Sequence, residues 1–140
     1  MKPLYKRFEY LSYLFRYEST YLEMKYHLKQ VIKGKETSYF KRIGHYDRNI
    51  GKSAALARLS AKYDIPVIVP TRSFADTIEN DIPMYIPRYF KKRTPKCICA
   101  NECFKGRKYD VVLVEENVDE KCLDAIFSPM TKAFVGYKND

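Results

Sequence analysis

The sequence predicts an α/β fold in which a small parallel sheet follows an N-terminal helix. Two short apolar runs, IPVIVPT at 65–71 and VVLVEE at 111–116, alternate along the chain with amphipathic helical segments. Strands that alternate with helices are typical of a parallel sheet with right-handed crossovers. The chain has 140 residues, of which 46% are hydrophobic, enough for one domain with a core of its own. We therefore expect a helical extension over residues 1–34 and a single compact α/β unit over residues 35–140.

A helix is expected over residues 3–33. Pro3 suits a first helical turn, and Gly34 suits a helix end. The sequence TYLE at 20–23 fits a capping box, which predicts a break into two helices near Ser19. Apolar residues recur at steps of three and four on both sides of that point, namely at Leu4, Phe8, Leu11, Phe15, Tyr21, Met24, Leu28 and Val31.

The remaining elements follow from β-branched runs, helix formers and turn residues. In chain order we expect a strand in TSYFKRIG (37–44), a helix over 53–63, a strand in IPVIVPT, a short helix in SFADTIEN (73–80) capped by Ser73, an extended segment over 80–96, a strand in KCICAN (96–101), a turn in FKGRKYD (104–110), a strand in VVLVEE, a helix in VDEKCLDAIF (118–127) and a last strand in KAFVGY (132–137).

The net charge of +9 is unevenly distributed. Residues 1–53 carry 12 Lys and Arg against 5 Asp and Glu, and residues 91–109 carry 7 against 1, whereas residues 110–140 carry 3 against 7. Basic blocks attract phosphate backbones without reading sequence, although a solvated basic surface explains them equally well. A protein partner, docked on the Leu4–Phe15 helix, is the alternative to nucleic acid.

No stretch is long and apolar enough to predict a membrane span, and charged residues interrupt any signal-peptide core, so we expect a cytoplasmic protein without a membrane partner. The four cysteines, Cys97, Cys99, Cys103 and Cys122, are irregularly spaced and do not suggest a disulfide framework. Structural zinc sites usually contain C-x₂-C knuckles, which are absent here. We expect buried thiols, and zinc binding stays open as the alternative.

The stretch YDRNIGKS at 46–53 carries the second half of a phosphate-binding loop, G-x-x-x-x-G-K-[ST]. In such a loop Gly51 lets the backbone approach a phosphate, Lys52 neutralises phosphate charge and Ser53 holds Mg²⁺. The backbone over Gly51–Ala54 would then form an anion-binding helix N-terminus. Tyr46 occupies the place of the first glycine, so the motif is degenerate.

About sixty residues after the GKS motif, the VVLV run ends directly in two carboxylates. A metal-bound nucleotide needs one carboxylate near Mg²⁺ and a second to orient the attacking water, and Glu115 and Glu116 fit these two roles. Ligands of open parallel sheets sit at the carboxyl ends of the strands, which both side chains can reach. The alternative is an exposed strand end with no catalytic role.

The order of a GKS helix, VIVPTRSFADTI, FKGRKYDVVLVEE and KAFVGY resembles the ATPase core of phage terminase large subunits and the first motor domain of superfamily-two helicases. The resemblance covers about residues 37–138. It implies a RecA-like P-loop core and an origin in a phage or mobile element. It also implies ATP and Mg²⁺ as ligands, with Lys52, Ser53 and the basic Arg48 at the phosphates and Glu116 as catalytic glutamate.

Further roles are implied only by this resemblance. Thr71 and Arg72 would lie near the nucleotide or the nucleic acid, and Glu115 stands where the family has an aspartate. The loops that carry basic residues would follow the nucleic-acid path, through Lys91, Lys92, Arg93, Lys105, Arg107 and Lys108. Since the sequence ends at Asp140, we expect no second motor lobe and no nuclease domain.

Two functions remain open at this point. One is a small ATPase-like protein that binds ATP·Mg and acts on or near nucleic acid. The other is a P-loop-derived binding protein that has lost hydrolysis and docks, as an inhibitor or adaptor, on a host protein that processes nucleic acid. The Gly51-Lys52-Ser53 motif and the two glutamates favour the first, and Tyr46 favours the second.

Overall fold

Five parallel strands form one sheet with the order β1-β5-β4-β2-β3. The computed structural model describes residues 4–44, 51–100, 109–126 and 131–139. The strands are β1 (Tyr39–Ile43), β2 (Val67–Val69), β3 (Cys97–Cys99), β4 (Tyr109–Val114) and β5 (Thr131–Asn139). The helices are α1 (Leu4–Ile32), α2 (Lys52–Tyr63), α3 (Arg72–Asp76), α4 (Ile82–Tyr85) and α5 (Glu120–Ile126), with a π-helical turn, η2 (Thr77–Asp81), between α3 and α4 and a 3₁₀ turn, η3 (Pro87–Tyr89), after α4.

The predicted fold class is confirmed: the chain is an α/β protein with an all-parallel sheet, a RecA-like arrangement of core helices and strands, and an N-terminal helix. The last strand, β5, lies between β1 and β4. Its register pairs Ile43 with Asn139 on one side and Val114 with Gly136 on the other. The strand that precedes the GKS motif is therefore separated by one strand from the strand that carries the two glutamates.

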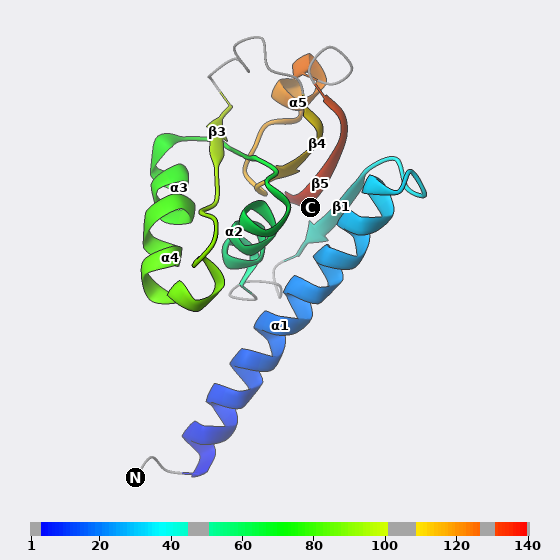
Figure 1. The fold of residues 1–140 in the computed structure, drawn as a ribbon. Helices are drawn as coiled ribbons and strands as arrows, with labels where there is room; N and C mark the ends of the chain where they lie inside the picture. The colour runs from blue at the N-terminus through cyan, green and yellow to red at the C-terminus, as the bar shows by residue number, and fades with distance from the viewer. Residues whose placement is uncertain (1–3, 45–50, 101–108, 127–130, 140) are drawn as a thin grey trace.

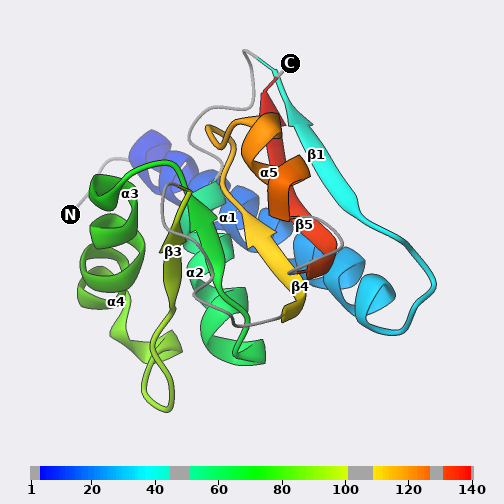
Figure 2. The ribbon, with the colours of Figure 1, turned by 90° about the horizontal axis from the view of Figure 1, so that it is seen from above.

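Helices cover both faces of the sheet (Figures 1 and 2). Alternate residues of the strands point to opposite faces, so Val67 and Val69 belong to one core and Ile68 to the other. The first core packs α1, α2, α3 and η2 against the sheet. The second core is smaller and packs Leu123 of α5 on the opposite face.

Helix α1 is one unbroken helix of 29 residues, so the predicted break near Ser19 is wrong. The hydroxyl of Thr20 donates to the carbonyl of Arg16 at 2.9 Å, four residues earlier, instead of capping a new helix. The helix ends at Ile32, and Gly34 lies in the turn that closes it, as predicted. Gly34 has a left-handed φ of 77°, and its N–H and that of Lys35 donate to Val31 and Gln30 in a Schellman motif.

The two halves of α1 have different surroundings. Met24 and Leu28 in the second half are fully buried in the first core. The first half projects beyond the body of the molecule (Figure 1), and its residues Leu11 and Phe15 are 58% and 77% exposed. The sequence pattern predicts the helix correctly but does not distinguish these halves.

The segment after β2 differs from its prediction. The helix follows Thr71 rather than Ser73, and no side chain caps it. It continues through η2 into α4, so residues 80–85 are helical where an extended segment is predicted. The wider turn ends at Asp81, two residues before Pro83. In a regular α-helix the ring of Pro83 would clash with the carbonyl four residues earlier, and a π-turn accommodates such a break.

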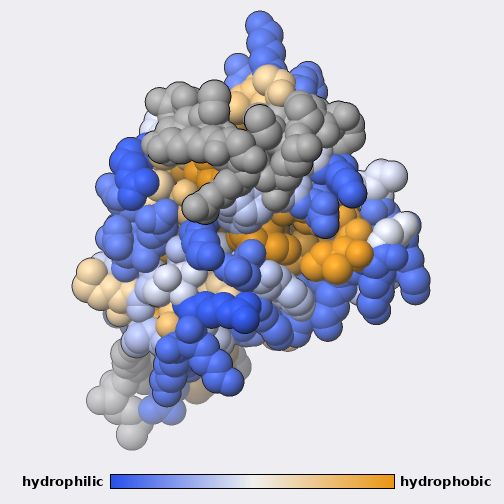
Figure 3. Space-filling model, turned by 45° about the horizontal axis from the view of Figure 1, so that its top comes forward, coloured by the Kyte–Doolittle hydropathy of each residue, from blue (hydrophilic) through white to orange (hydrophobic). Residues whose placement is uncertain are grey.

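The surface is mixed in character. Figure 3 shows the face that comes forward when the top of Figure 1 is tilted toward the reader; outside the grey residues, hydrophilic residues surround a smaller apolar area. Within the described ranges, no helix has both the length and the apolar character that a membrane span requires.

Candidate phosphate-binding site at the carboxyl edge of the sheet

The carboxyl ends of the parallel strands share one edge of the sheet, and α2 begins at this edge. Gly51 is the N-cap of α2, with φ 81° and ψ 30° in the left-handed region that favours glycine. No side chain caps the helix. The first turn of any α-helix leaves N–H groups without an intrahelical partner, and these groups attract anions. Lys52, Ser53 and Ala54 form this first turn, as the motif predicts.

Tyr17 of α1 packs against the cap. A Cβ atom added to Gly51 would lie 2.6 Å from Cδ2 of Tyr17, so the ring leaves no room for a side chain. Burial raises the pKa of the Tyr17 phenol to about 12, against an opposing effect of Arg58. The sequence predicts the glycine but not this contact, which joins the N-terminal helix to the start of α2.

Lys52 and Glu116 form an ion pair at this edge. Nζ of Lys52 lies 3.1 Å from Oε1 of Glu116, and the side chains are 15% and 19% exposed. One residue starts α2, and the other follows β4, so the fold brings together two groups that are far apart in sequence. These are the predicted phosphate-binding cation and the predicted catalytic carboxylate.

Glu115 has different surroundings from Glu116. Its side chain is buried, and it accepts hydrogen bonds from the backbone N–H of Asn117 at 2.8 Å and from Nδ2 of Asn117 at 3.0 Å. Burial raises the pKa of Glu115, and the charge of Glu116 adds to this effect, whereas Asn117 and Lys52 oppose it. Ser53 and Glu115, the predicted metal ligands, share no hydrogen bond in the described part of the chain.

Three further residues complete the site and were not predicted. Nδ2 of Asn139, at the end of β5, donates to the carbonyl of Glu116 at 3.4 Å and to Oδ1 of Asn117 at 3.3 Å. Tyr137 is buried beside them. Burial raises its pKa strongly, with Glu23, Tyr39 and Glu116 adding, and its hydroxyl has no hydrogen-bond partner among the described residues. The only sequence feature that pointed here was the polar end of the last strand.

Other predicted residues lie elsewhere. Arg48 falls outside the described residues, as do Tyr46, Lys105, Arg107 and Lys108. Arg72 begins α3, at the same edge of the sheet as Glu116, and it pairs at 3.4 Å with both Asp76 and Glu79. Its charge is thus shared between two carboxylates.

Lys91, Lys92 and Arg93 lie in a hollow of about 660 Å³ at the other end of α2. We call this hollow the basic groove. Six cationic side chains line it, together with Ala61 and two tyrosines: Arg58, Lys62, Arg88, Lys91, Lys92, Arg93, Tyr21 and Tyr89. Lys62 is ten residues along α2 from Lys52, or about 15 Å at the rise of an α-helix. Within the described residues, the structure therefore separates Lys91, Lys92 and Arg93 of the predicted basic patch from the candidate phosphate-binding site.

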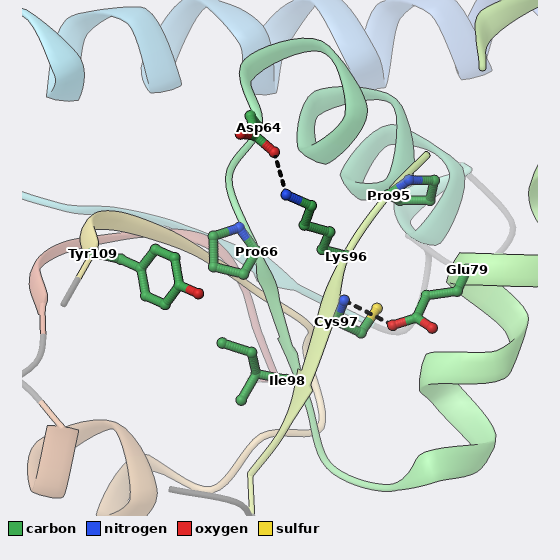
Figure 4. A pocket seen from close by; sticks show the side chains of 8 residues that line it. All are labelled: Asp64, Pro66, Glu79, Pro95, Lys96, Cys97, Ile98 and Tyr109. Carbon is green, nitrogen blue, oxygen red and sulfur yellow. Dashed lines mark hydrogen bonds and ion pairs between the residues drawn. The ribbon is translucent and has the colours of Figure 1, made fainter. Parts of the chain in front are cut away.

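The cysteines show no metal centre within the described residues. Cys97 and Cys99 stand on the same side of β3, where both pack against the first core. Cys97 borders a second hollow of about 640 Å³ (Figure 4), in which its N–H donates to Glu79 at 2.9 Å and Lys96 pairs with Asp64 at 2.8 Å. Burial raises the pKa of the Cys97 thiol to about 12, which keeps it in the neutral form that metals bind poorly. Cys103 lies outside the described residues.

Comparisons with protein families, curated proteins and solved structures found no match to this chain.

Proposed function

We propose that the chain is a small P-loop ATPase-like protein that binds ATP·Mg at the carboxyl edge of the sheet and acts on or near nucleic acid. The observation that supports this most is the ion pair between Lys52 and Glu116 at the N-terminus of α2. An isolated GKS tripeptide occurs in many proteins. A GKS lysine that meets a carboxylate from the end of a neighbouring parallel strand is a much more specific arrangement.

The ion pair between Lys52 and Glu116 also suggests how the site would bind a nucleotide. Phosphate oxygens would compete with Glu116 for Lys52, and the helix N-terminus would add its N–H groups. Once released from Lys52, Glu116 would be available to orient a water molecule for attack. The same contact therefore holds both groups in place before nucleotide arrives.

The side chains present fit Mg²⁺ in part. Mg²⁺ prefers oxygen ligands, and Ser53 and Glu116 offer them from the two elements that meet at the ion pair. Glu115 fits less well, because its carboxylate is buried against Asn117. When bound together with the nucleotide, Mg²⁺ would neutralise charge on the phosphates.

Calorimetry with ATP·Mg tests the proposal. Lys52→Ala should lose ATP affinity at least tenfold while far-UV circular dichroism shows an unchanged helix content. Lys132→Ala is the matched control, since this lysine is 82% exposed and far from the edge. Equal ATP affinity of wild type and Lys52→Ala would overturn the assignment of the site.

Phosphate-release kinetics then separate the two forms of the proposal. Glu116→Gln should keep ATP binding and lose turnover, since the amide cannot act as a base. If the wild type binds ATP without releasing phosphate, the chain is instead the non-hydrolysing binding protein. The exposed apolar residues on the projecting half of α1, Leu4, Leu11 and Phe15, favour that second function, because they offer a contact surface to a protein partner.

A further inference from the structure

The basic groove collects cations from segments that are distant in sequence. Arg58 and Lys62 come from α2, Arg88 from η3, and Lys91, Lys92 and Arg93 from the chain that follows. Arg58 pairs with Glu18 at 2.9 Å. Asp64 lies near the far end of the groove, where Lys96 and, more weakly, Arg93 lower its pKa. No carboxylate among the described residues lines this hollow, so the positive charges that converge there repel one another unless an anion binds.

Lys25 of α1 adds to the same concentration of charge. The neighbouring Lys62 lowers the pKa of Lys25. The nearby charge of Arg58 acts in the same direction. Two lysines this close are stabilised by a shared anion.

The aromatic rings of the groove are already occupied. The guanidinium of Arg58 stacks 3.6 Å from the centre of the Tyr21 ring and 3.8 Å from that of Tyr89. Arg88 lies over Tyr89 as well, at 4.7 Å. These rings hold guanidinium groups in place, and a nucleic-acid base would have to displace them in order to stack.

The groove continues along the chain. Lys91, Lys92 and Arg93 also line a neighbouring hollow of about 450 Å³, which extends to Thr94, Lys96 and Asp64. The carboxylate of Asp64 pairs there with Lys96 at 2.8 Å. The two hollows share Lys91, Lys92 and Arg93 as a common wall, so the cations form a track rather than a single pocket. A track suits a ligand whose negative charges repeat along its length.

We propose that the basic groove binds the sugar-phosphate backbone of a nucleic acid and does not read its bases. This inference rests on the nucleic-acid part of the proposed function and gives it a location, at the opposite end of α2 from the nucleotide site. An acidic protein fits less well, because a peptide needs partners for its backbone and apolar side chains, whereas the groove presents mainly cationic heads.

Fluorescence anisotropy with two labelled oligonucleotides tests this. One is oligo(dT), and the other has the same length and abasic sugars throughout. Both should bind the wild type within threefold of each other at low salt, because only phosphates are contacted. For single strands, the slope of log affinity against log salt falls by about 0.7 for each phosphate contact removed. Lys62→Gln and Lys91→Gln together should therefore lower affinity for both strands and flatten the slope by about 1.4.

Controls separate the failure of this inference from that of the function. Lys62 and Lys91 are exposed, so the double variant should fold, and its ATP affinity by calorimetry should equal that of the wild type. Lys132→Gln should leave DNA binding unchanged. Normal DNA binding by the double variant, or at least tenfold weaker binding of the abasic strand, would overturn the groove assignment alone. If the wild type binds neither strand at low salt, the nucleic-acid part of the proposed function fails together with the groove assignment. The same conclusion follows if the wild type binds polyglutamate of equal charge but neither oligonucleotide.

Discussion

At Gly136 the backbone of β5 comes too close to β4 to admit any side chain. A Cβ atom there would overlap the carbonyl oxygen of Val114. Gly136→Ala should lower the free energy of unfolding by about 1–3 kcal/mol through overpacking, measured by chemical denaturation. Gly34→Ala is the comparison, because nothing lies within 4 Å of its Cβ and only its left-handed φ costs energy, about 1 kcal/mol. A smaller loss at Gly136 than at Gly34 would show that the two strands can move apart.

Glu115 should make stability depend on pH. Burial raises its pKa in the folded chain above the ordinary value of 4.5, so the folded protein holds this proton more tightly than the unfolded chain. The resulting stabilisation is complete below pH 4.5 and is lost as the pH rises through the raised pKa. Glu115→Gln removes this titration. As the pH rises from 4 to 8, the melting temperature of the variant should therefore increase relative to that of the wild type.

An exposed carboxylate provides the control for this measurement. Asp110 is 86% exposed, and Asp110→Asn removes a negative charge without a buried site. A constant difference in melting temperature between Glu115→Gln and wild type over the same pH range would contradict the buried position of Glu115.

The residues of the site differ in how far the sequence predicts them. The Gly51-Lys52-Ser53 motif and the two glutamates are visible in the sequence, because each sits at the end of a recognisable strand or the start of a helix. The sequence does not show that Glu115 is buried against Asn117 whereas Glu116 pairs with Lys52. This difference depends on the turn at Asn117, which draws one carboxylate inward and leaves the other for Lys52.

At the scale of elements, the two halves of α1 should respond differently to mutation. Leu28 is fully buried in the first core, so Leu28→Ala should cost about 2–5 kcal/mol of unfolding free energy. Leu11 is 58% exposed, and Leu11→Ala makes the same chemical change outside the core, with an expected effect within about 0.5 kcal/mol. Similar losses at both positions, measured by denaturant titration, would mean that the first half is also packed against something.

Because the second half of α1 belongs to the core, only the first half can be removed in a test for protein partners. Removal of residues 1–33 would take Met24 and Leu28 out of the core. A truncation before Phe15 keeps the core and removes most of the projecting half.

Most elements are predictable because their patterns are local. Each of the five predicted strands, TSYFKRIG, IPVIVPT, KCICAN, VVLVEE and KAFVGY, overlaps an observed strand, although β4 begins two residues before VVLVEE and β5 extends beyond KAFVGY at both ends. Besides the misplaced cap at Ser73, two predictions are wrong because a local pattern has two solutions. The Thr20 hydroxyl can cap a helix or bond back to the preceding turn, and burial against the core selects the second. Pro83 can end a helix or be accommodated by a wider turn, and packing of Ile78 in the first core keeps the helix intact.

For the molecule as a whole, the fold redistributes the charge that the sequence shows in blocks. Residues 54–90 are neutral in sum, yet Arg58, Lys62 and Arg88 from this segment line the basic groove. They join Lys91, Lys92 and Arg93 from a basic block. Two candidate sites therefore lie at the two ends of α2, one with paired charges of opposite sign and the other with charges of one sign. No count along the sequence could place them there, because only the folded helix joins them.

The projecting half of α1 also affects how the molecule behaves in solution. A helix of 29 residues is about 43 Å long, and the N-terminal half of α1 lies outside the body of the molecule (Figure 1). The protein is therefore elongated rather than spherical. It should tumble anisotropically and elute from a sizing column ahead of spherical proteins of 16.6 kDa. Its scattering profile should contain long interatomic distances that a sphere of this mass does not have.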